Sequence, residues 1–403
     1  MSKQDRISTA ILGIALYLIA TGLTFGVLTL TAKKSAPDTV APPDTADGNG
    51  GLVINPSTPR TDPCPLNGQL YTTEERKIWE ARRPLAIMVE NHVDSRPHSG
   101  LVAADIVYEA VSEGGVTRFM GIFYCGVSAK NTVIAPVRSA RTPFLPWVLE
   151  YDAPYIHVGG AGNCNDESVD PRAKSLCQID QYKIKDMDQF GLPFTIKEES
   201  GKKQYVCKRN YERLGREIAT EHTMECFTNG LYLFAARERN WTNIDAKGIS
   251  WDKNFVSWKF KDDVGQSERG TASAVSFVAW KGYEKDFGVR WVYDPAANFY
   301  NRVMGGLPHT DLETKAQVSA KNVIIQFARE IGPVDDHGHI LYENTGSGEG
   351  RLFQDGIEIK ITWKKPKRTD RTIFYDVQGT EVKLNRGPIW IEILPTGAKV
   401  EVS

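Results

Sequence analysis

The sequence predicts an α/β layered N-terminal domain with a mixed sheet, followed by a smaller β-rich C-terminal domain, behind an N-terminal transmembrane anchor. Three observations predict this class: a long uncharged run near the N-terminus, short apolar strands that alternate with helical segments in the first half, and strand-like segments punctuated by turn residues after Trp241. The predicted parts are a cytoplasmic tail (1–6), the anchor (7–32), a flexible stalk (33–62), the α/β domain (63–242) and the β-rich domain (243–403).

The run from Ile7 to Ala32 carries no charged residue. It is long enough to cross about 30 Å of hydrocarbon, whereas a cleavable signal peptide usually has an apolar core of only about 7–15 residues. The sequence at its end, TLTAKK, is a poor cleavage site, so we expect an uncleaved single-pass anchor with the bulk of the chain extracytoplasmic. The next stretch is rich in Pro, Asp, Gly and Thr and would hold the folded part off the bilayer.

Composition limits the partners and the compartment. The chain of 403 residues has a formal net charge of −1, so it lacks the overall positive field that favours nucleic acid, and any anion site must be local. Its six cysteines are even in number, which suggests disulfides outside the membrane; free buried thiols are the alternative. Six cysteines allow fifteen complete pairings, among which Cys164–Cys177 and Cys207–Cys226 are local pairs that cost least to close.

Local signals predict the elements of the first half. Thr72 and Glu75 form a capping-box pattern that starts a helix, which should run to about Arg83 and stop before Pro84. The stretch 113–115, Glu-Gly-Gly, joins two apolar runs and indicates a hairpin. The other predicted strands are LAIMVE (85–90), TVIAPV (132–137) and YIHVGG (155–160), and the other predicted helices are TPFLPWVLEY (142–151), YERLGREIATEH (211–222) and TNGLYLFAARER (228–239).

Three arginines are the main candidates for ligand binding. Arg138 and Arg141 follow the apolar run TVIAPV, and Arg118 begins a neighbouring predicted strand. Strand ends are the usual place for function in an open α/β sheet, and arginine suits bidentate capture of phosphate or carboxylate. We therefore expect these three residues to form an anion-binding site. The competing interpretation is that they brace the sheet edge by pairing with nearby carboxylates: Asp105, Glu109 or Glu113.

Several other residues are candidates for catalysis or metal binding. Glu109 and Glu113 lie four positions apart on a predicted strand, so alternation puts both on one face, where they could act as acid and base or hold a divalent metal ion. His157 is followed by glycines that allow close approach of a ligand, although a histidine in a buried strand is more often a core residue. Asp105 is a further candidate metal ligand, and His222 a candidate general base or ligand; salt-bridged or solvated roles are the alternative for the carboxylates.

The second half offers weaker signals. The run 335–339, Asp-Asp-His-Gly-His, has metal-ligand residue types, but its tight spacing fits a loop better. The run 346–350, Gly-Ser-Gly-Glu-Gly, is not followed by a helix and so lacks the context of a phosphate-binding loop. We expect it to be a hairpin turn.

Several longer stretches carry a resemblance to a known family. In the first half they are RPLAIMVEN, RPHSGLVAADIVYEAVSEGGVTRFMGIFY, APVRSAR and YDAPYIHVGG, and in the second they include VRWVYDPAANFYNRVMGGLPHTD and GSGEGRLFQDGIEIKITWKKPKRTDRTIFYD. Over most of residues 80–400 the chain resembles the YerB-like family of bacterial cell-envelope proteins, which is defined by a paired domain of unknown function. The resemblance implies a location and an architecture but no reaction.

Two departures from the family pattern matter. Members of the family often carry a lipobox cysteine, whereas this chain has the long uncharged segment 7–32. The family also tends to show a Pro-His-Asn-like stretch where this chain reads Glu221-His222-Thr223, which puts a shared role for His222 in doubt.

We therefore expect a membrane-anchored extracytoplasmic protein of the cell envelope that binds an anionic or peptidoglycan-related ligand, an anionic wall polymer, or an envelope partner protein. One alternative is an envelope enzyme, a phosphotransferase or hydrolase, in which Arg118, Arg138 and Arg141 stabilise developing negative charge. The other is a structural scaffold of a wall-synthesis or division complex, in which the arginines only support the fold.

Overall fold

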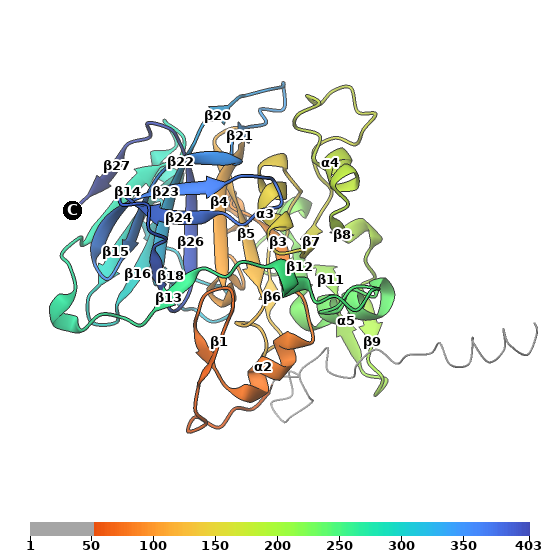
Figure 1. Cartoon of the computed structure of the whole chain (residues 1–403). Helices are drawn as coiled ribbons and strands as arrows, with labels where there is room; N and C mark the ends of the chain where they lie inside the picture. Colours follow the sequence, from red (N-terminus) through yellow and green to blue (C-terminus); the bar gives the residue numbers. More distant parts are fainter. Residues whose placement is uncertain (1–51) are drawn as a thin grey trace, which may run out of the picture. The chain divides into compact units, whose positions relative to one another are not determined.

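The structure is a computed structural model that describes residues 52–403. A ten-stranded mixed sheet runs through this part of the chain in the order β24-β23-β22-β19-β26-β4-β5-β3-β7-β8 (Figure 1). Both halves of the chain contribute strands to it. The strands are β3 (Leu85–Glu90), β4 (Ile106–Glu113), β5 (Val116–Phe123), β7 (Pro154–His157), β8 (Lys185–Asp188), β19 (Asn322–Ala328), β22 (Gly346–Gln354), β23 (Ile357–Lys365), β24 (Ile373–Asp376) and β26 (Ile389–Pro395).

A second, six-stranded sheet comes from the second half of the chain. Its order is β17-β16-β15-β14-β27, with β18 paired to β16. Tryptophan rings hold it against the large sheet: Trp291 packs edge-on against Trp390 of β26, with 5.3 Å between ring centroids. The strands are β14 (Ala274–Val278), β15 (Gly288–Asp294), β16 (Phe299–Met304), β17 (Leu307–Pro308), β18 (Ser319–Ala320) and β27 (Val400–Val402).

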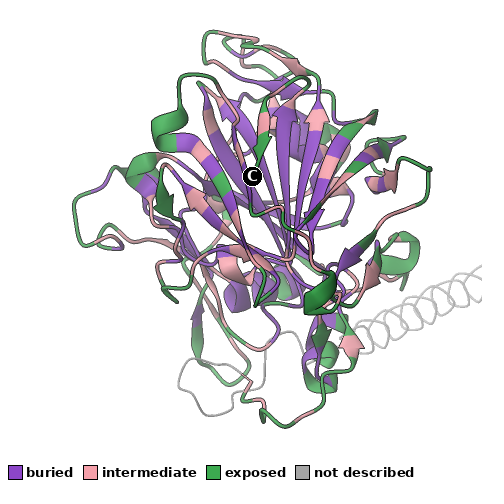
Figure 2. Cartoon of the chain, turned by 90° about the vertical axis from the view of Figure 1, so that its left-hand side faces the viewer, coloured by how far each residue is buried: buried purple, intermediate pink, exposed green. Residues whose placement is uncertain are grey.

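The central strands of the large sheet are covered on both faces. All six residues of β3 are buried, which explains why LAIMVE is a continuous apolar run and not an alternating one. Ala86 and Met88 enter one hydrophobic core, whereas Ile87 and Val89 enter the other, as the two-residue period of a strand requires. Figure 2 shows the buried strands at the centre and exposed residues mainly in the peripheral loops.

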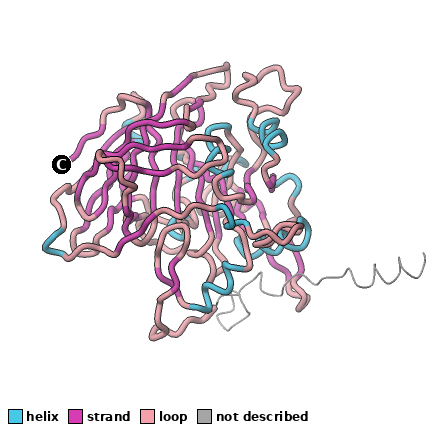
Figure 3. Tube along the Cα trace, in the orientation of Figure 1, coloured by secondary structure: helices cyan, strands magenta, loops and turns pink. Residues whose placement is uncertain are grey.

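The helices are short and few beside the strands (Figure 3). The predicted capping box is confirmed: Thr72 Oγ1 accepts from Glu75 N at 3.3 Å, and a Glu75 carboxylate oxygen accepts from Thr72 N at 2.8 Å. The helix ends before Arg83, at Glu80, and the predicted helix 228–239 is confirmed. The helices are α2 (Thr73–Glu80), α3 (Leu145–Leu149), α4 (Ser175–Tyr182), α5 (Thr228–Arg239) and α6 (Glu284–Phe287).

Three local predictions are wrong. Residues 211–222 form turns and one short 3-10 helix, η5 (Thr220–His222), because Gly215 adopts a positive φ of 64° and Arg213 bonds to distant carbonyl oxygens of the 95–97 loop. The strand predicted over 132–137 is only β6 (Val133–Ile134). The run 346–350 lies inside strand β22, so it is not a turn.

Smaller sheets flank the two large ones, and disulfides tie the loops of the first half. The predicted local pairs Cys164–Cys177 and Cys207–Cys226 are confirmed, and Cys64–Cys125 is the third bridge. The small sheets are formed by β1 (Asp62–Pro63) with β2 (Leu70–Tyr71), β9 (Thr195–Lys197) with β10 (Lys203–Tyr205), β6 with β12 (Met224–Phe227) and β11 (Cys207–Arg209), β13 (Lys259–Lys261) with β25 (Lys383–Asn385), and β20 (Glu330–Ile331) with β21 (Leu341–Tyr342).

The mixed-sheet, β-rich architecture agrees with the predicted class, but the two halves share a sheet. Strand β26 of the second half pairs in parallel with β4 of the first, from Ile389 opposite Ile106 to Glu392 opposite Glu109. The predicted boundary at 242/243 stays a prediction. The anchor predicted over 7–32 lies outside the described residues, and within 52–403 no helix is long and apolar enough to cross a membrane.

Candidate functional site

One edge of the ten-stranded sheet collects most of the predicted site residues. Strands β4 and β3 are both antiparallel to β5, and β3, β7 and β8 are mutually parallel, so β3, β4, β7 and β8 end at the same edge. In open α/β sheets, ligands bind outside these carboxyl ends. We call the set at this edge the arginine edge; it consists of Glu90, Glu113, Arg118, Arg138 and Arg141.

The segment that carries Arg138 and Arg141 crosses this edge. Arg138 N donates to Met88 O of β3 at 3.0 Å, and Val158 N, just after β7, donates to Arg138 O at 3.1 Å. Two residues on, Ala140 N donates to Gly159 O at 2.9 Å. The chain thus lies along the ends of β3 and β7, which holds both arginines at this edge of the sheet.

Glu113 is the centre of the first ion-pair cluster. It accepts from Arg141 Nε at 2.5 Å and from Arg141 Nη2 at 2.9 Å, and it also pairs with Arg118 Nη2. Arg118 Nη1 donates to Ser139 O at 2.9 Å. Burial alone would raise the pKa of Glu113, but the two guanidinium groups outweigh it and lower that pKa to about 2. Glu113 is therefore ionised and shared between two cations.

Glu90 is the centre of the second cluster. Its Oε1 accepts from Arg138 Nε at 3.0 Å, and its Oε2 lies 2.7 Å from Nδ1 of His222. The side chain of Arg138 is 28% exposed, and its two terminal nitrogens make no hydrogen bond within residues 52–403. Among the guanidinium and carboxylate groups of the two clusters, three cations face two anions, which is an excess of one positive charge at the arginine edge.

A pocket of about 390 Å³ opens beside Arg141. Two loops close it, one between β7 and α4 and the other between β20 and β21, and both lie at the top of the view in Figure 1. Asp170 N donates to Asp335 Oδ2 at 3.1 Å between them. The lining includes Glu113, Arg141, Gly160, Ser168, His337 and His339.

The two histidines of this pocket come from the run 335–339, for which the sequence favoured a plain loop. His339 Nδ1 lies 2.8 Å from Asp335 Oδ2, so the carboxylate orients the ring. His337 Nε2 lies 3.4 Å from Ser168 Oγ. The sequence signal was present in the residue types, but only the fold brings these side chains to Arg141, more than 190 positions away by residue number.

Glu109 does not share a pocket with Glu113, and that prediction is wrong. A register shift between Val111 and Glu113 in the β4–β5 ladder inserts an extra residue, so the strict alternation is lost. Glu113 thereby turns to the face of Arg118, whereas Glu109 turns to the six-stranded sheet. There Glu109 Oε2 accepts from Arg302 Nη2 at 2.6 Å, and its Oε1 accepts from Thr117 Oγ1 at 2.8 Å.

Two histidines extend this buried network. Arg302 Nη1 lies 2.9 Å from His309 Nδ1, and His309 Nε2 lies 2.8 Å from His98 Nδ1. Burial, and then the nearby Arg302 or Arg96, lowers the pKa of both histidines well below the usual 6.5. Since the arginine can only donate, His309 accepts at Nδ1 and donates from Nε2, so both rings are neutral in the fold.

The free energy of unfolding should therefore depend on these two histidines at mildly acidic pH. The unfolded chain takes up protons below about pH 6.5 while the folded rings stay neutral, so stability should fall from pH 7 towards pH 5, by up to about 1.4 kcal/mol per histidine and pH unit. Denaturant titrations at several pH values test this. The His98→Asn/His309→Gln double variant should show a shallower slope, and an unchanged slope would contradict the assignment.

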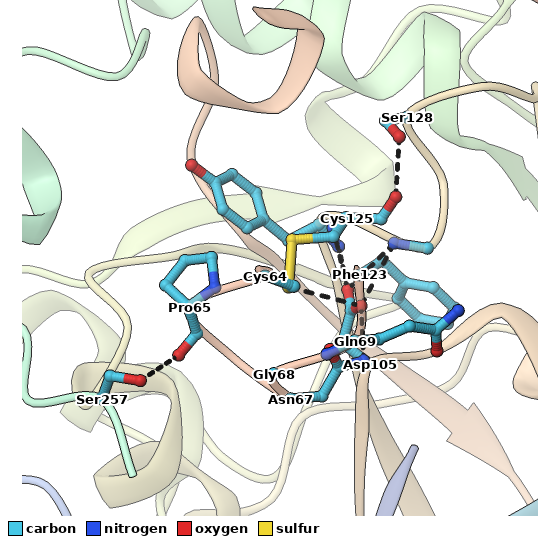
Figure 4. Close-up of a disulfide and its surroundings, with 12 residues drawn as sticks. Cys64, Pro65, Asn67, Gly68, Gln69, Asp105, Phe123, Cys125, Ser128 and Ser257 are labelled. Atoms are coloured by element: carbon cyan, nitrogen blue, oxygen red, sulfur yellow. Dashed lines mark hydrogen bonds between the residues drawn. A yellow bond between two sulfur atoms is a disulfide. The ribbon is translucent and has the colours of Figure 1, made fainter. Parts of the chain in front are cut away.

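His157 and Asp105 are enclosed by hydrogen-bond partners. Both ring nitrogens of the fully buried His157 are engaged, Nε2 by Asp186 Oδ1 and Nδ1 by Gly159 O, each at 2.8 Å. Asp105 accepts from three successive backbone amides, Tyr124 to Gly126, at 2.7–3.1 Å, and from Asn67 Nδ2 at 3.0 Å, beside the Cys64–Cys125 disulfide (Figure 4). Burial raises the pKa of Asp105 to about 7. These contacts favour structural roles over the predicted catalytic and metal-binding ones.

Comparison with known proteins assigns both halves of the chain to one family. Residues 68–224 match the N-terminal domain, and residues 278–391 the C-terminal domain, of DUF3048, described as a protein of unknown function. The chain is 28% identical over 342 residues to YerB of Bacillus subtilis (strain 168), which is named as a candidate lipoprotein; the match covers 84% of this chain and 88% of the relative.

The fold is also similar to a solved structure. The crystal structure of the YerB protein from Bacillus subtilis superimposes with a TM-score of 0.62 at 24% identity, covering 85% of this chain and 100% of that chain. The predicted family resemblance is thus confirmed by sequence and by fold. The chain belongs to the YerB-like family, whose paired domains have no assigned function.

Proposed function

We propose that this protein is an extracytoplasmic, membrane-associated protein of the bacterial cell envelope that binds an anionic ligand at the arginine edge. The name of its Bacillus relative, a candidate lipoprotein, supports the location. The three disulfides support it independently, because disulfides persist in oxidising compartments outside the cytoplasm.

We further propose that a single-pass anchor, and not an N-terminal acylated cysteine, attaches this chain to the membrane. The first cysteine of this chain is Cys64, and it is bonded to Cys125. The apolar segment 7–32 is long enough to span a bilayer and supports a single-pass anchor in its place.

The observation that carries the ligand proposal is the excess of positive charge beside the pocket. Three guanidinium groups face two carboxylates, and Arg141 lines a pocket of about 390 Å³. Arg138 is not among the residues that line this pocket, but its two terminal nitrogens make no hydrogen bond within residues 52–403 and are free to donate to an oxyanion. A phosphate, pyrophosphate or carboxylate group of a peptidoglycan-related molecule has the chemistry that this edge would recognise.

A hydrolytic enzyme is the second candidate, and one observation favours it. Asp335 holds the imidazole of His339 in the pocket, as a carboxylate orients a general-base histidine. In that case Arg141 would stabilise negative charge on the substrate as it develops. Hydrolysis of a bound muropeptide or phosphoester by the purified chain would distinguish this function from binding alone.

The proposal predicts a ligand-dependent rise in the thermal midpoint of the full-length chain in mild detergent. A ligand at 100 times its Kd should stabilise the fold by about 2.7 kcal/mol. Phosphate, pyrophosphate and muropeptides are the probes, measured by differential scanning fluorimetry. The rise should disappear in Arg141→Ala, because Arg141 lines the pocket, while Arg118 remains to pair with Glu113.

The matched control is Arg329→Ala. Arg329 is 70% exposed and pairs with Glu343 on the surface, so its loss should leave the ligand response intact. If no probe raises the midpoint of the wild type, and Arg141→Ala only lowers it, the arginines are a brace and the scaffold alternative stands. Arg138→Lys adds a finer comparison, since lysine keeps the charge but cannot make a bidentate contact.

A further inference from the structure

Two loops that are distant in sequence bring a second group of ligating side chains together. His92 and Asp94 follow strand β3, and His222 ends η5. One ring nitrogen of each histidine and one carboxylate oxygen of Asp94 lie within 4.8 Å of one another. The two imidazole rings stack, with 5.2 Å between centroids and 10° between planes.

His222 is held in the manner of a metal-binding histidine. Its Nδ1 lies 2.7 Å from Glu90 Oε2, and its Nε2 makes no hydrogen bond within residues 52–403 although the residue is only 6% exposed. A carboxylate on one ring nitrogen fixes the orientation of the ring and leaves the other nitrogen available as a ligand. Glu90 is itself fixed from the other side by Arg138.

We propose that His92, Asp94 and His222 bind a divalent transition-metal ion such as Zn²⁺, with Glu90 as the carboxylate that orients His222. Two imidazoles and one carboxylate suit zinc and its neighbours in the first transition row, and three protein ligands leave a further position open to water or an anion. The side chains of His92 and Asp94 are 41% and 62% exposed, so an ion reaches the site from solvent.

Coordination requires one movement. Two nearly parallel rings cannot both direct a nitrogen lone pair at the same ion, so one ring must turn. His222 is buried and bonded to Glu90, whereas His92 is half-exposed and its Nδ1 contacts only Asp94, by accepting from Asp94 N at 3.3 Å and lying 3.6 Å from Asp94 Oδ2. The ring of His92 therefore turns when the ion binds, and the stacked pair separates.

The test is Zn²⁺ binding to the full-length, EDTA-treated chain in mild detergent, measured by isothermal titration calorimetry. We expect one ion per chain. Glu90→Gln should weaken binding by about 10–100-fold, as loss of an orienting carboxylate does. His92→Ala and Asp94→Asn remove direct ligands and should weaken binding at least as much. With Co²⁺ in place of Zn²⁺, the visible absorption of the bound ion should be lost in both ligand variants.

His337→Ala is the matched control. His337 is also an exposed histidine next to another histidine, His339, but it lies at the pocket of Arg141 and not at the proposed metal site. It should bind Zn²⁺ like the wild type. Three results would each overturn the proposal. They are wild-type affinity in both His92→Ala and Asp94→Asn, absence of Zn²⁺ binding by the wild type, and loss of binding in His337→Ala alone. The side chains of His92 and Asp94 are half-exposed or more, so both variants should keep the thermal midpoint of the metal-free wild type. An unchanged midpoint shows that the variants are folded. Phosphate binding at Arg141 is measured separately and does not depend on this site.

Discussion

Replacing Arg302 by methionine should lower the free energy of unfolding by about 3–5 kcal/mol, because it leaves a buried carboxylate without its cation. Arg302 is fully buried between the two large sheets and pairs with Glu109 at 2.6 Å. Glu392 lies next to this pair, and burial followed by the charge of Glu109 raises the pKa of Glu392 well above its usual range. Arg302 is therefore the cation that compensates negative charge at a site where a second carboxylate, Glu392, is already hard to ionise.

Denaturant unfolding of the full-length chain, followed by tryptophan fluorescence, measures this loss. Arg329→Met is the matched control at an exposed ion pair and should change the free energy of unfolding by no more than about 1 kcal/mol. Adding Glu109→Gln to Arg302→Met should restore part of the loss, since it removes the unpaired charge. A loss for Arg302→Met no larger than that of the control would mean that the network contributes little.

Replacing Glu150 by glutamine should have an effect of similar size, about 3–5 kcal/mol, because it leaves two buried cations without an anion. Glu150, just after α3, accepts from Lys365 Nζ and from Arg371 Nη1, each at 2.7 Å, and from Thr372 Oγ1 at 2.6 Å. The side chains of the glutamate and the lysine are fully buried. Glutamine keeps the shape of the side chain, so the loss reports on charge and not on packing.

Glu343→Gln is the control for this substitution, since Glu343 is half-exposed and pairs with Arg329 on the surface. The same denaturant experiment applies. If Glu150→Gln unfolds at the denaturant midpoint of Glu343→Gln, water reaches the cluster and the charges are not buried in solution. Both buried clusters join a residue of the first half to residues of the second, so either variant should weaken the contact between the halves.

Elements with local signals were predictable from the sequence. The capping box at Thr72 and Glu75, the continuous apolar run 85–90 and the hairpin around 113–115 each depend on neighbouring residues, and each is present in the fold. The helix predicted over 211–222 had no such support. Tertiary contacts determine the structure of this run, because the Arg213 side chain donates to the carbonyl oxygens of Ser95 and Pro97 and the segment forms turns in place of a helix.

The candidate site was predictable only in part. We expected Arg118 at the start of one predicted strand to meet Arg138 and Arg141 at the end of another, and the structure brings all three to one edge. Their partners did not follow, because one extra residue in β4 turns Glu113 towards Arg118 and leaves Glu109 on the opposite face. A bulge has no reliable local signal, and a shift of one residue exchanges the two faces of a strand.

By itself the sequence determined the family, the β-rich second half and the residue types available for binding an anion, and it favoured the two local disulfides without fixing them. Only the tertiary structure decided that the halves share one sheet, that His337 and His339 line the pocket of Arg141, and that His92 stacks on His222. Local propensity, periodicity and short loop closure act over a few residues and can be read along the chain. Pairings between residues more than a hundred positions apart depend on the packing of both faces of the sheet, which no local pattern specifies.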